Sequence, residues 1–183
     1  MKTGLFGGSF DPIHLGHIEA ARAAMAAAGL DRVIFLPSGR SPHKDLCASP
    51  LDRFNMTKEA VRDISGFTVS DFETKKETKC YSVQTVEEFK KLYPYDELYF
   101  IIGDDEYASF DKWYKADELI KMCRFLVITR HGEDIRPPFI GVDMPKIPIS
   151  SSMIREVLKN GGDITPYVNK STARYITEHK LYR

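Results

Sequence analysis

The sequence lacks an excess of charge, a cysteine framework and any long hydrophobic run, and each absence excludes a class of protein. Lysine plus arginine total 26, as do aspartate plus glutamate, so no overall positive field attracts nucleic acid. Cys47, Cys80 and Cys123 form no CxxC pair, which is typical of a reduced intracellular protein with buried free thiols. No stretch approaches the roughly 20 apolar residues that span a bilayer.

The first residues also lack the hydrophobic segment of a signal peptide, because MKTGLFGGSFDP becomes glycine-rich after a few apolar positions. We therefore expect a cytoplasmic protein with no membrane partner and no nucleic-acid partner. Hydrophobic residues make up 43% of the 183 positions and charged residues 28%, as in globular proteins that bury a core. With no internal repeat or linker, residues 1–183 are predicted to form a single domain.

Short apolar runs alternate with amphipathic segments of helical length, a pattern typical of parallel strands joined by helices. Strands are predicted near residues 2–6, 32–36, 67–70, 97–102 and 125–129, with a weaker one around 144–147. Helices are predicted at 15–28, from 49–50 onward, at 82–93, 115–122 and 151–160, and from 165–166 toward 179. These elements predict an α/β fold with a doubly wound parallel sheet, in which ligands bind at the carboxyl ends of the strands.

The loop after the first strand carries most of the candidate chemistry. Its glycines, Gly7 and Gly8, let the backbone approach a phosphate or ribose closely, and the N–H groups at the following helix start favour anions. His14 and His17 are three residues apart, so in the first turn of a helix they share one face and can hold a phosphate. Solvated or capping histidines are the alternative. A zinc site is a weaker interpretation, because the HExxH spacing is absent.

Two motifs at opposite ends of the chain carry a resemblance. The segment GGSFDPIHLGH resembles the first signature of the nucleotidyltransferase superfamily that contains an HxGH motif, and ISSSMIR at 149–155 resembles its second signature, ISSTxIR. Ser150, Ser151 and Ser152 supply hydroxyl and N–H groups at a helix start, with Arg155 in the same turn. A serine N-cap with a surface arginine explains the second motif equally well by itself. Together the motifs predict a triphosphate clamp, and the resemblance implies a Rossmann-like sheet.

Further segments are similar to one family, the bacterial nicotinate-nucleotide adenylyltransferases. The proline-rich segment 37–44 resembles a family loop that ends in PHK, and it carries Arg40, His43 and Lys44. The segment 101–105 resembles the motif IIGxD, which implies that Asp105 lies near ribose hydroxyls and that Gly103 contacts ATP. A metal site at the adjacent carboxylates and a solvated turn are the alternatives for this acidic pair.

The acceptor side of the predicted site rests on three more segments. Residues 81–85 resemble the family's YTxxT, with Ser82 in place of threonine and Thr85 retained. Residues 112–114 match KWY, whose tryptophan, Trp113, offers a flat apolar face to a pyridine ring, although core packing is the alternative. Arg130 stands where the family has RPG, but here histidine replaces the proline.

The resemblance implies transfer of the AMP part of ATP to nicotinate mononucleotide, with Mg²⁺ carried by ATP and no protein-bound metal. The implied catalytic groups are those of His14, His17, Lys44 and Arg155. The implied ATP contacts are Gly7, Gly8, Ser9, Phe10, His14, His17, Arg40, His43, Gly103, Asp105, Ser150, Ser151, Ser152 and Arg155. The implied mononucleotide contacts are Ser9, Lys44, Ser82, Thr85, Trp113, Tyr114 and Arg130.

Four alternatives remain open at this stage. Nicotinamide mononucleotide differs from the nicotinate form only locally. A phosphopantetheine adenylyltransferase shares both signatures but is expected to carry threonine where this chain has His14. A dehydrogenase-type dinucleotide module is disfavoured because GxGxxG is absent and Asp31 precedes the second strand. A non-catalytic nucleotide sensor is disfavoured by the retained histidines and Arg155. The sequence does not decide between a monomer and a homo-oligomer.

Overall fold

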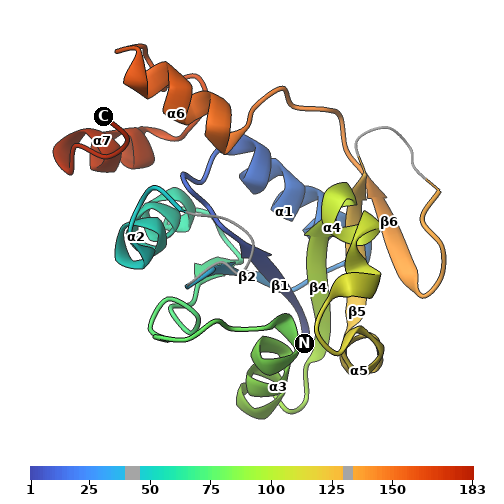
Figure 1. Cartoon of the computed structure of the whole chain (residues 1–183). Coiled ribbons are helices and arrows are strands. Elements are labelled where there is room, and N and C mark those ends of the chain that lie inside the picture. Colours follow the sequence, from blue (N-terminus) through green and yellow to red (C-terminus); the bar gives the residue numbers. More distant parts are fainter. Residues whose placement is uncertain (40–45, 130–133) are drawn as a thin grey trace.

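A single parallel sheet organises the molecule, as the computed structural model shows for residues 1–39, 46–129 and 134–183 (Figure 1). Its strands lie in the order β3-β2-β1-β4-β5-β6, and every neighbouring pair is parallel. The winding order reverses between β1 and β4, so the predicted doubly wound α/β sheet is confirmed. The strands are β1 (Lys2–Gly8), β2 (Arg32–Pro37), β3 (Phe67–Val69), β4 (Glu97–Gly103), β5 (Arg124–Thr129) and β6 (Phe139–Asp143).

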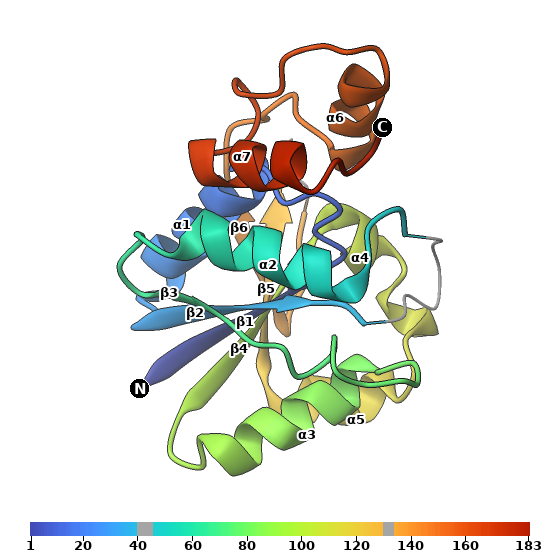
Figure 2. The same ribbon diagram turned by 90° about the vertical axis from the view of Figure 1, so that its left-hand side faces the viewer.

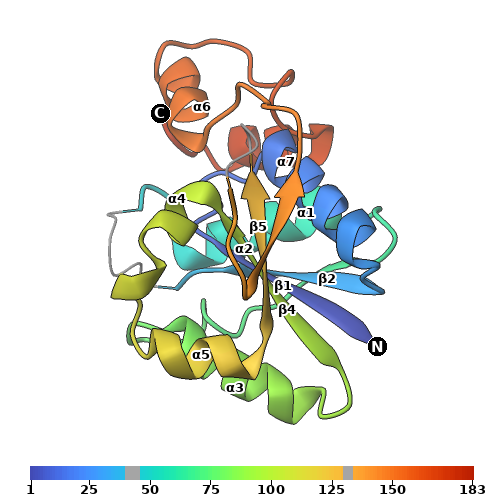
Figure 3. The same cartoon turned by 90° about the vertical axis from the view of Figure 1, so that its right-hand side faces the viewer.

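Helices cover both faces of this sheet, as Figures 2 and 3 show from opposite sides. On one face lie α1 (Leu15–Ala28) and α2 (Pro50–Val61), with α6 (Ser151–Lys159) and α7 (Lys170–Glu178) beyond them. On the other face lie α3 (Ser82–Leu92) and α5 (Ala116–Met122). After β4 come the short helix α4 (Asp104–Ala108) and the 3-10 turn η1 (Phe110–Lys112).

Each face of the sheet has its own hydrophobic cluster, because side chains alternate along every strand. On β1, Phe6 packs with Phe10 and Ile154 on the face of α1, α2 and α6. Its neighbour Leu5 packs with Phe110 and other residues on the face of α3 and α5. Within the described residues, no helix combines the length and the apolar character needed to cross a membrane.

Two predicted elements are wrong in position. The strand expected around 144–147 lies earlier, at β6, since Phe139–Asp143 pairs with β5 while Pro145 and Pro148 cannot donate to a strand ladder. The last helix does not begin at 165–166. There the Asp163 carboxylate accepts the N–H and hydroxyl of Thr165, which makes a turn, and α7 starts after its cap, Asn169.

Candidate active site

The candidate site lies at the carboxyl ends of β1 and β4, where the winding order of the sheet reverses. The chain leaves β1 at Gly8 and enters α1 at Leu15, so the loop between them passes over this point. Its residues 10–14 are buried although they belong to no helix or strand. A loop fixed in this way provides a rigid support for the two histidines that follow.

The histidine pair forms a compact unit at the start of α1. The Nδ1 atom of His17 accepts the backbone N–H of His14 at 3.2 Å, and the two rings stack with their centroids 3.7 Å apart. A neutral His17 therefore carries its ring proton on Nε2, which is a hydrogen-bond donor. Gly16 permits this packing, because a Cβ at that position would lie 3.0 Å from the ring of His14. This contact explains the glycine of the HxGH motif.

The ring of Phe10 explains the second glycine of the loop. Phe10 is almost fully buried, at 1% exposure, and its backbone adopts a positive φ of 47°. This conformation turns the ring inward, where a Cβ on Gly8 would lie 2.8 Å from it. Phe10 also packs edge-on against His17, with ring centroids 5.0 Å apart. Gly8 therefore serves the packing of the loop, whereas a Cβ at Gly7 would meet only ordinary contacts.

The start of α6 docks onto the same loop. Arg155 donates from Nη1 to the backbone carbonyl of Asp11 at 2.6 Å, and the hydroxyl of Ser151 donates to the carbonyl of Pro12 at 2.8 Å. Ser150 caps the helix by accepting the N–H of Met153. The two motifs from opposite ends of the sequence thus meet at one loop, directly before His14.

Arg155 is also held from within its own helix turn. Its second terminal nitrogen, Nη2, donates to the hydroxyl of Ser152 at 3.2 Å. The guanidinium is therefore fixed between α6 and the loop that carries the histidines, and it is only partly buried. A planar cation oriented by two hydrogen bonds can present its remaining N–H groups to an anion.

A buried arginine that the sequence analysis missed lies beneath this loop. Arg53 on α2 is fully buried and donates to the carbonyls of Ser9 at 2.8 Å, Gly39 at 2.8 Å and Ala48 at 3.3 Å. Burial lowers the pKa of its guanidinium, and the nearby Asp11 opposes that change. The signal was present in the sequence, because Arg53 occupies the apolar face of α2 with Met56, Thr57, Ala60 and Val61.

On the other side of the switch point, two aromatic segments meet. The rings of Tyr81 and Tyr114 lie 4.7 Å apart, which joins the start of α3 to the segment after η1. Trp113 is half-buried and packs against Phe100 and Phe110, with ring centroids 6.2 and 5.3 Å apart. The core packing of Trp113 is therefore observed, and its role as a platform for a pyridine ring stays a prediction. Ser82 lies next to Tyr81 at the helix start.

Thr85 lies deeper than the sequence analysis expected. It is fully buried, and its hydroxyl donates to the carboxylate of Glu73 at 2.7 Å. The thiol of Cys80 lies 3.5 Å from the same hydroxyl. Burial raises the pKa of Glu73 to about 7, although the Thr85 hydrogen bond and Lys76 lower it. The hydroxyl of Thr85 thus faces the protein interior rather than an open pocket.

This raised pKa predicts a pH-dependent stability. The neutral carboxyl of Glu73 is favoured in the folded protein, so the contribution of Glu73 to stability is greatest below the ordinary pKa of 4.5 and is lost as the pH rises through about 7. Glu73→Gln keeps an oxygen for Thr85 and cannot ionise. We expect its unfolding free energy, relative to the parent protein, to increase by up to about 3 kcal/mol between pH 4 and pH 8 in urea titrations. A constant difference over that range would contradict this prediction.

The acidic turn after β4 forms helix α4 rather than a loop. The Glu106 carboxylate accepts the N–H of Gly103 at 3.0 Å, and Asp105 is exposed in the first turn. In the part of the chain that the structure describes, no group of three or more histidine, cysteine, aspartate or glutamate residues could hold a metal ion.

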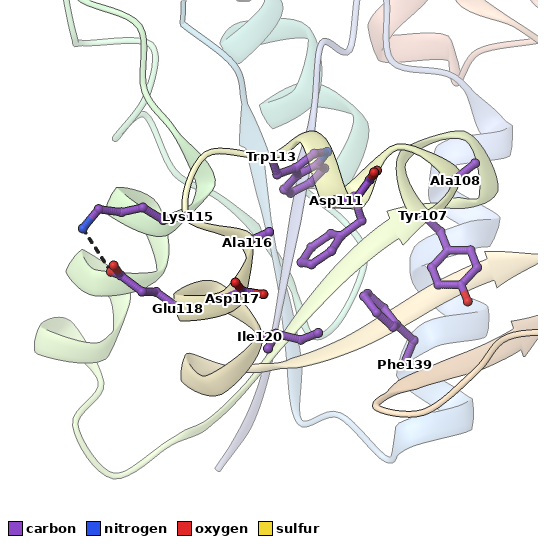
Figure 4. A pocket seen from close by; sticks show the side chains of 11 residues that line it. Tyr107, Ala108, Asp111, Trp113, Lys115, Ala116, Asp117, Glu118, Ile120 and Phe139 are labelled. Atoms are coloured by element: carbon purple, nitrogen blue, oxygen red, sulfur yellow. Dashed lines mark hydrogen bonds and ion pairs between the residues drawn. The ribbon is translucent and has the colours of Figure 1, made fainter.

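A cavity of about 830 Å³ opens between α4, η1, α5 and β6 (Figure 4). Trp113, Phe110 and Phe139 supply apolar walls. The remaining polar lining is mainly acidic, from Asp111, Asp117 and Glu118, and Glu118 accepts a hydrogen bond from Lys115 at 3.0 Å. This charge does not fit a phosphate. The nucleotide site is accordingly expected at the switch point and not in the cavity.

Comparison with known proteins decides the family. The model of the cytidylyltransferase-like family matches residues 5–157, which include both signature motifs. The chain belongs to the cytidylyltransferase-like family. Within this family it is 40% identical to a protein of Thermus thermophilus over 186 residues and 36% identical to one of Clostridium tetani over 198 residues. These alignments cover 100% of this chain, and 100% and 99% of the two relatives.

Both relatives carry the name "Probable nicotinate-nucleotide adenylyltransferase". The resemblance to this branch of the cytidylyltransferase-like family, predicted from the motifs, is therefore confirmed. Among solved structures, the chain resembles the Plasmodium falciparum nicotinic acid mononucleotide adenylyltransferase complexed with NaAD. The TM-score is 0.82 at 24% identity, covering 100% of this chain and 98% of the other. At that identity the likeness supports the fold alone.

Four of the expected site residues lie outside the described residues of this cytidylyltransferase-like chain. They are Arg40, His43, Lys44 and Arg130. Other expected residues meet at the β1 loop. They are Ser9, Phe10, His14 and His17 of the loop and the start of α1, and Ser150, Ser151, Ser152 and Arg155 at the start of α6. Ser82 and Tyr114 lie at or beside the start of α3, Trp113 packs on Phe100 and Phe110, and Thr85 is buried.

Proposed function

We propose that the chain transfers the adenylyl group of ATP to nicotinate mononucleotide, giving nicotinate adenine dinucleotide and pyrophosphate in NAD biosynthesis. The observation that carries this proposal is the hydrogen bond from Arg155 to the carbonyl of Asp11, which unites the two signature motifs. The names of the full-length relatives support the acceptor. The Plasmodium falciparum enzyme, solved with NaAD and with APC, supports the fold on which this reaction is proposed.

In this reaction a phosphate oxygen of the mononucleotide attacks the α-phosphorus of ATP. A new phosphorus–oxygen bond forms, the bond to the bridging oxygen of the β-phosphate breaks, and pyrophosphate leaves with its electron pair. The attacking phosphate is already an anion, so no general base is required. The protein must instead align two polyanions and stabilise charge at the transferred phosphorus.

The residues of the β1 loop and α6 are assigned to ATP. His14, His17 and Arg155 donate hydrogen bonds to the triphosphate, with Lys44 as a fourth donor. Mg²⁺ arrives with ATP as part of the substrate and shares the triphosphate charge. The backbone of residues 7–10 and Gly103, the hydroxyls of residues 150–152, and the side chains of Arg40, His43 and Asp105 complete the ATP contacts.

The aromatic side is assigned to the mononucleotide. Trp113 and Tyr114 contact the pyridine ring, and Ser82 lies near its carboxylate. Ser9, Lys44 and Arg130 contact the phosphate. Since Thr85 is fully buried, its contribution is the placement of the start of α3. We further assign residues 1–183 to one nucleotidyltransferase domain and the protein to the cytoplasm, which its three free cysteines support.

A pyrophosphate-release assay tests this function. The protein is incubated with MgATP and, in separate reactions, nicotinate mononucleotide, nicotinamide mononucleotide and phosphopantetheine. We expect the nicotinate form to react fastest and phosphopantetheine not at all. A faster reaction with the nicotinamide form would correct the acceptor. Tight MgATP binding without pyrophosphate release from any acceptor would instead indicate a nucleotide sensor.

Trp113→Ala is expected to raise the KM for the mononucleotide about tenfold, the effect of losing roughly 1–1.5 kcal/mol of ring contact. The KM for MgATP is expected to stay unchanged, because Trp113 lies on the acceptor side. Trp113→Phe is the matched control, since it retains an aromatic ring against Phe100 and Phe110. Steady-state kinetics with each substrate varied in turn measures both values. A raised KM for MgATP alone would contradict the placement of the ring.

A further inference from the structure

The next-to-last residue of the chain reaches the loop that precedes the histidines. Tyr182 follows α7 with a positive φ of 64°, and its hydroxyl donates to Oδ1 of Asp11 at 2.7 Å. Its hydroxyl also lies 3.9 Å from the sulfur of Met56, and the ring packs against the cluster that holds Phe10 and Ile154. The C-terminal end is therefore part of the support of the candidate site.

Asp11 is the point where three segments of the chain are joined. Its carboxylate is 3% exposed and accepts the backbone N–H groups of Cys47 at 2.7 Å and Ala48 at 3.1 Å, together with the Tyr182 hydroxyl. Its carbonyl accepts Arg155. One residue thus fixes the entry to α2, the C-terminal end and the guanidinium of α6 relative to the β1 loop.

The Tyr182 hydroxyl is a stable donor in this arrangement. Burial and the hydrogen bond to Asp11 raise the pKa of the phenol far above its ordinary value, so it stays protonated at neutral pH. A buried carboxylate needs its lone pairs satisfied, and hydrogen bonds to charged groups are stronger than neutral ones. Removal of this donor leaves Asp11 under-satisfied and free to shift.

We propose that Tyr182 is a positioning residue for adenylyl transfer: through Asp11 it fixes the Asp11 carbonyl that orients Arg155. This inference rests on the proposed function. The Tyr182 hydroxyl bonds to Asp11 and lies beside Met56, so it acts through the loop. A shift of Asp11 moves Arg155 relative to His14 and His17, so the ATP side weakens. The aromatic part of the acceptor side, at Trp113 and Tyr114, lies on the opposite face of the sheet and stays unchanged.

Tyr182→Phe tests the proposal, because it removes only the hydroxyl. Tyr175→Phe is the matched control: Tyr175 also lies near the C-terminal end and donates to a carboxylate, Asp52 on α2, at 3.0 Å. For Tyr182→Phe we expect kcat/KM for MgATP to fall about tenfold, the effect of losing one hydrogen bond to a charged group, with an unchanged KM for the mononucleotide. Tyr175→Phe is expected to stay within about twofold of the parent protein.

Two further measurements separate positioning from a merely structural role. Amide hydrogen exchange at Cys47 and Ala48 is expected to increase in Tyr182→Phe alone, since the Asp11 carboxylate accepts both amides. Calorimetric titration with MgATP is expected to show weaker binding in Tyr182→Phe alone. Equal kcat/KM in Tyr182→Phe and the parent protein, or an equal loss in Tyr175→Phe, would overturn the proposal. If the parent protein adenylylates no acceptor, the proposed function fails. The MgATP titration still shows whether Tyr182 positions the groups that bind ATP.

Discussion

His17→Ala is expected to lower the turnover of adenylyl transfer by about a hundred- to a thousandfold, the loss typical of one donor used mainly in the transition state. The structure gives the physical reason, because the His14 N–H occupies Nδ1 of His17 and leaves Nε2–H as the donor. The ring is further fixed by Phe10 and by its stack on His14. Single-turnover measurements of pyrophosphate release isolate this chemical step.

Two further variants test this role. One separates hydrogen-bond donation by His17 from helix capping, and the other is a control at an exposed histidine. His17→Asn retains an oxygen that can accept the His14 N–H but lacks the Nε2–H donor, so we expect it to lose turnover as His17→Ala does. His179→Ala removes an exposed histidine that stacks on Tyr175 at 3.9 Å and is expected to leave turnover unchanged. Near-normal turnover in a well-folded His17→Ala protein would refute the catalytic role.

Arg53→Met is expected to lower the unfolding free energy by about 3–5 kcal/mol, as when one partner of a buried charged network is removed. The methionine fills a similar volume but leaves the carbonyls of Ser9, Gly39 and Ala48 without their donor. Urea titration followed by circular dichroism measures the change. The loss is expected to be larger than for most single substitutions, because three chain segments are released at once.

Arg62→Met is the control for this prediction. Arg62 ends the same helix, its side chain is 56% exposed, and it pairs with Glu59 at 3.0 Å. Exposed pairs of this kind contribute about 0–1 kcal/mol, so the variant is expected to be almost as stable as the parent. An equal loss in the two variants would show that the carbonyl contacts of Arg53 contribute nothing beyond an ordinary surface arginine.

Much of the fold could be predicted because its signals are local. Apolar runs such as Phe100 to Ile102 and Phe125 to Thr129 identify central strands, and Ser49 followed by Pro50 identifies the start of α2. Strand β6 was misplaced because Gly141 and the preceding prolines, Pro137 and Pro138, lower the local strand propensity of this segment. Parallel pairing with β5 stabilises the strand nevertheless. Pairing is a tertiary effect, and no local pattern contains it.

The residues of the candidate site also fall into two groups, those that local sequence motifs reveal and those that only tertiary contacts reveal. The histidines and Arg155 were found because their motifs are contiguous in the sequence. Arg53, Asp11 and Tyr182 support these groups through contacts between distant residues. Arg53 and Ser9 are 44 positions apart and Tyr182 and Asp11 are 171 apart, so local sequence patterns do not reveal them. The burial of Thr85 was missed for a similar reason, since its partner Glu73 belongs to the loop before α3.

The two faces of the sheet have separate hydrophobic clusters, and this separation affects how members of the family can diverge. The proposed triphosphate side lies over the cluster of Phe10 and Ile154, and the aromatic part of the proposed acceptor side belongs to the cluster of Phe110 and Trp113. The central strands lie between the clusters, so substitutions beneath one substrate are expected to add independently to substitutions beneath the other. A new acceptor can therefore be selected by repacking one layer while the adenylate donor chemistry is inherited intact.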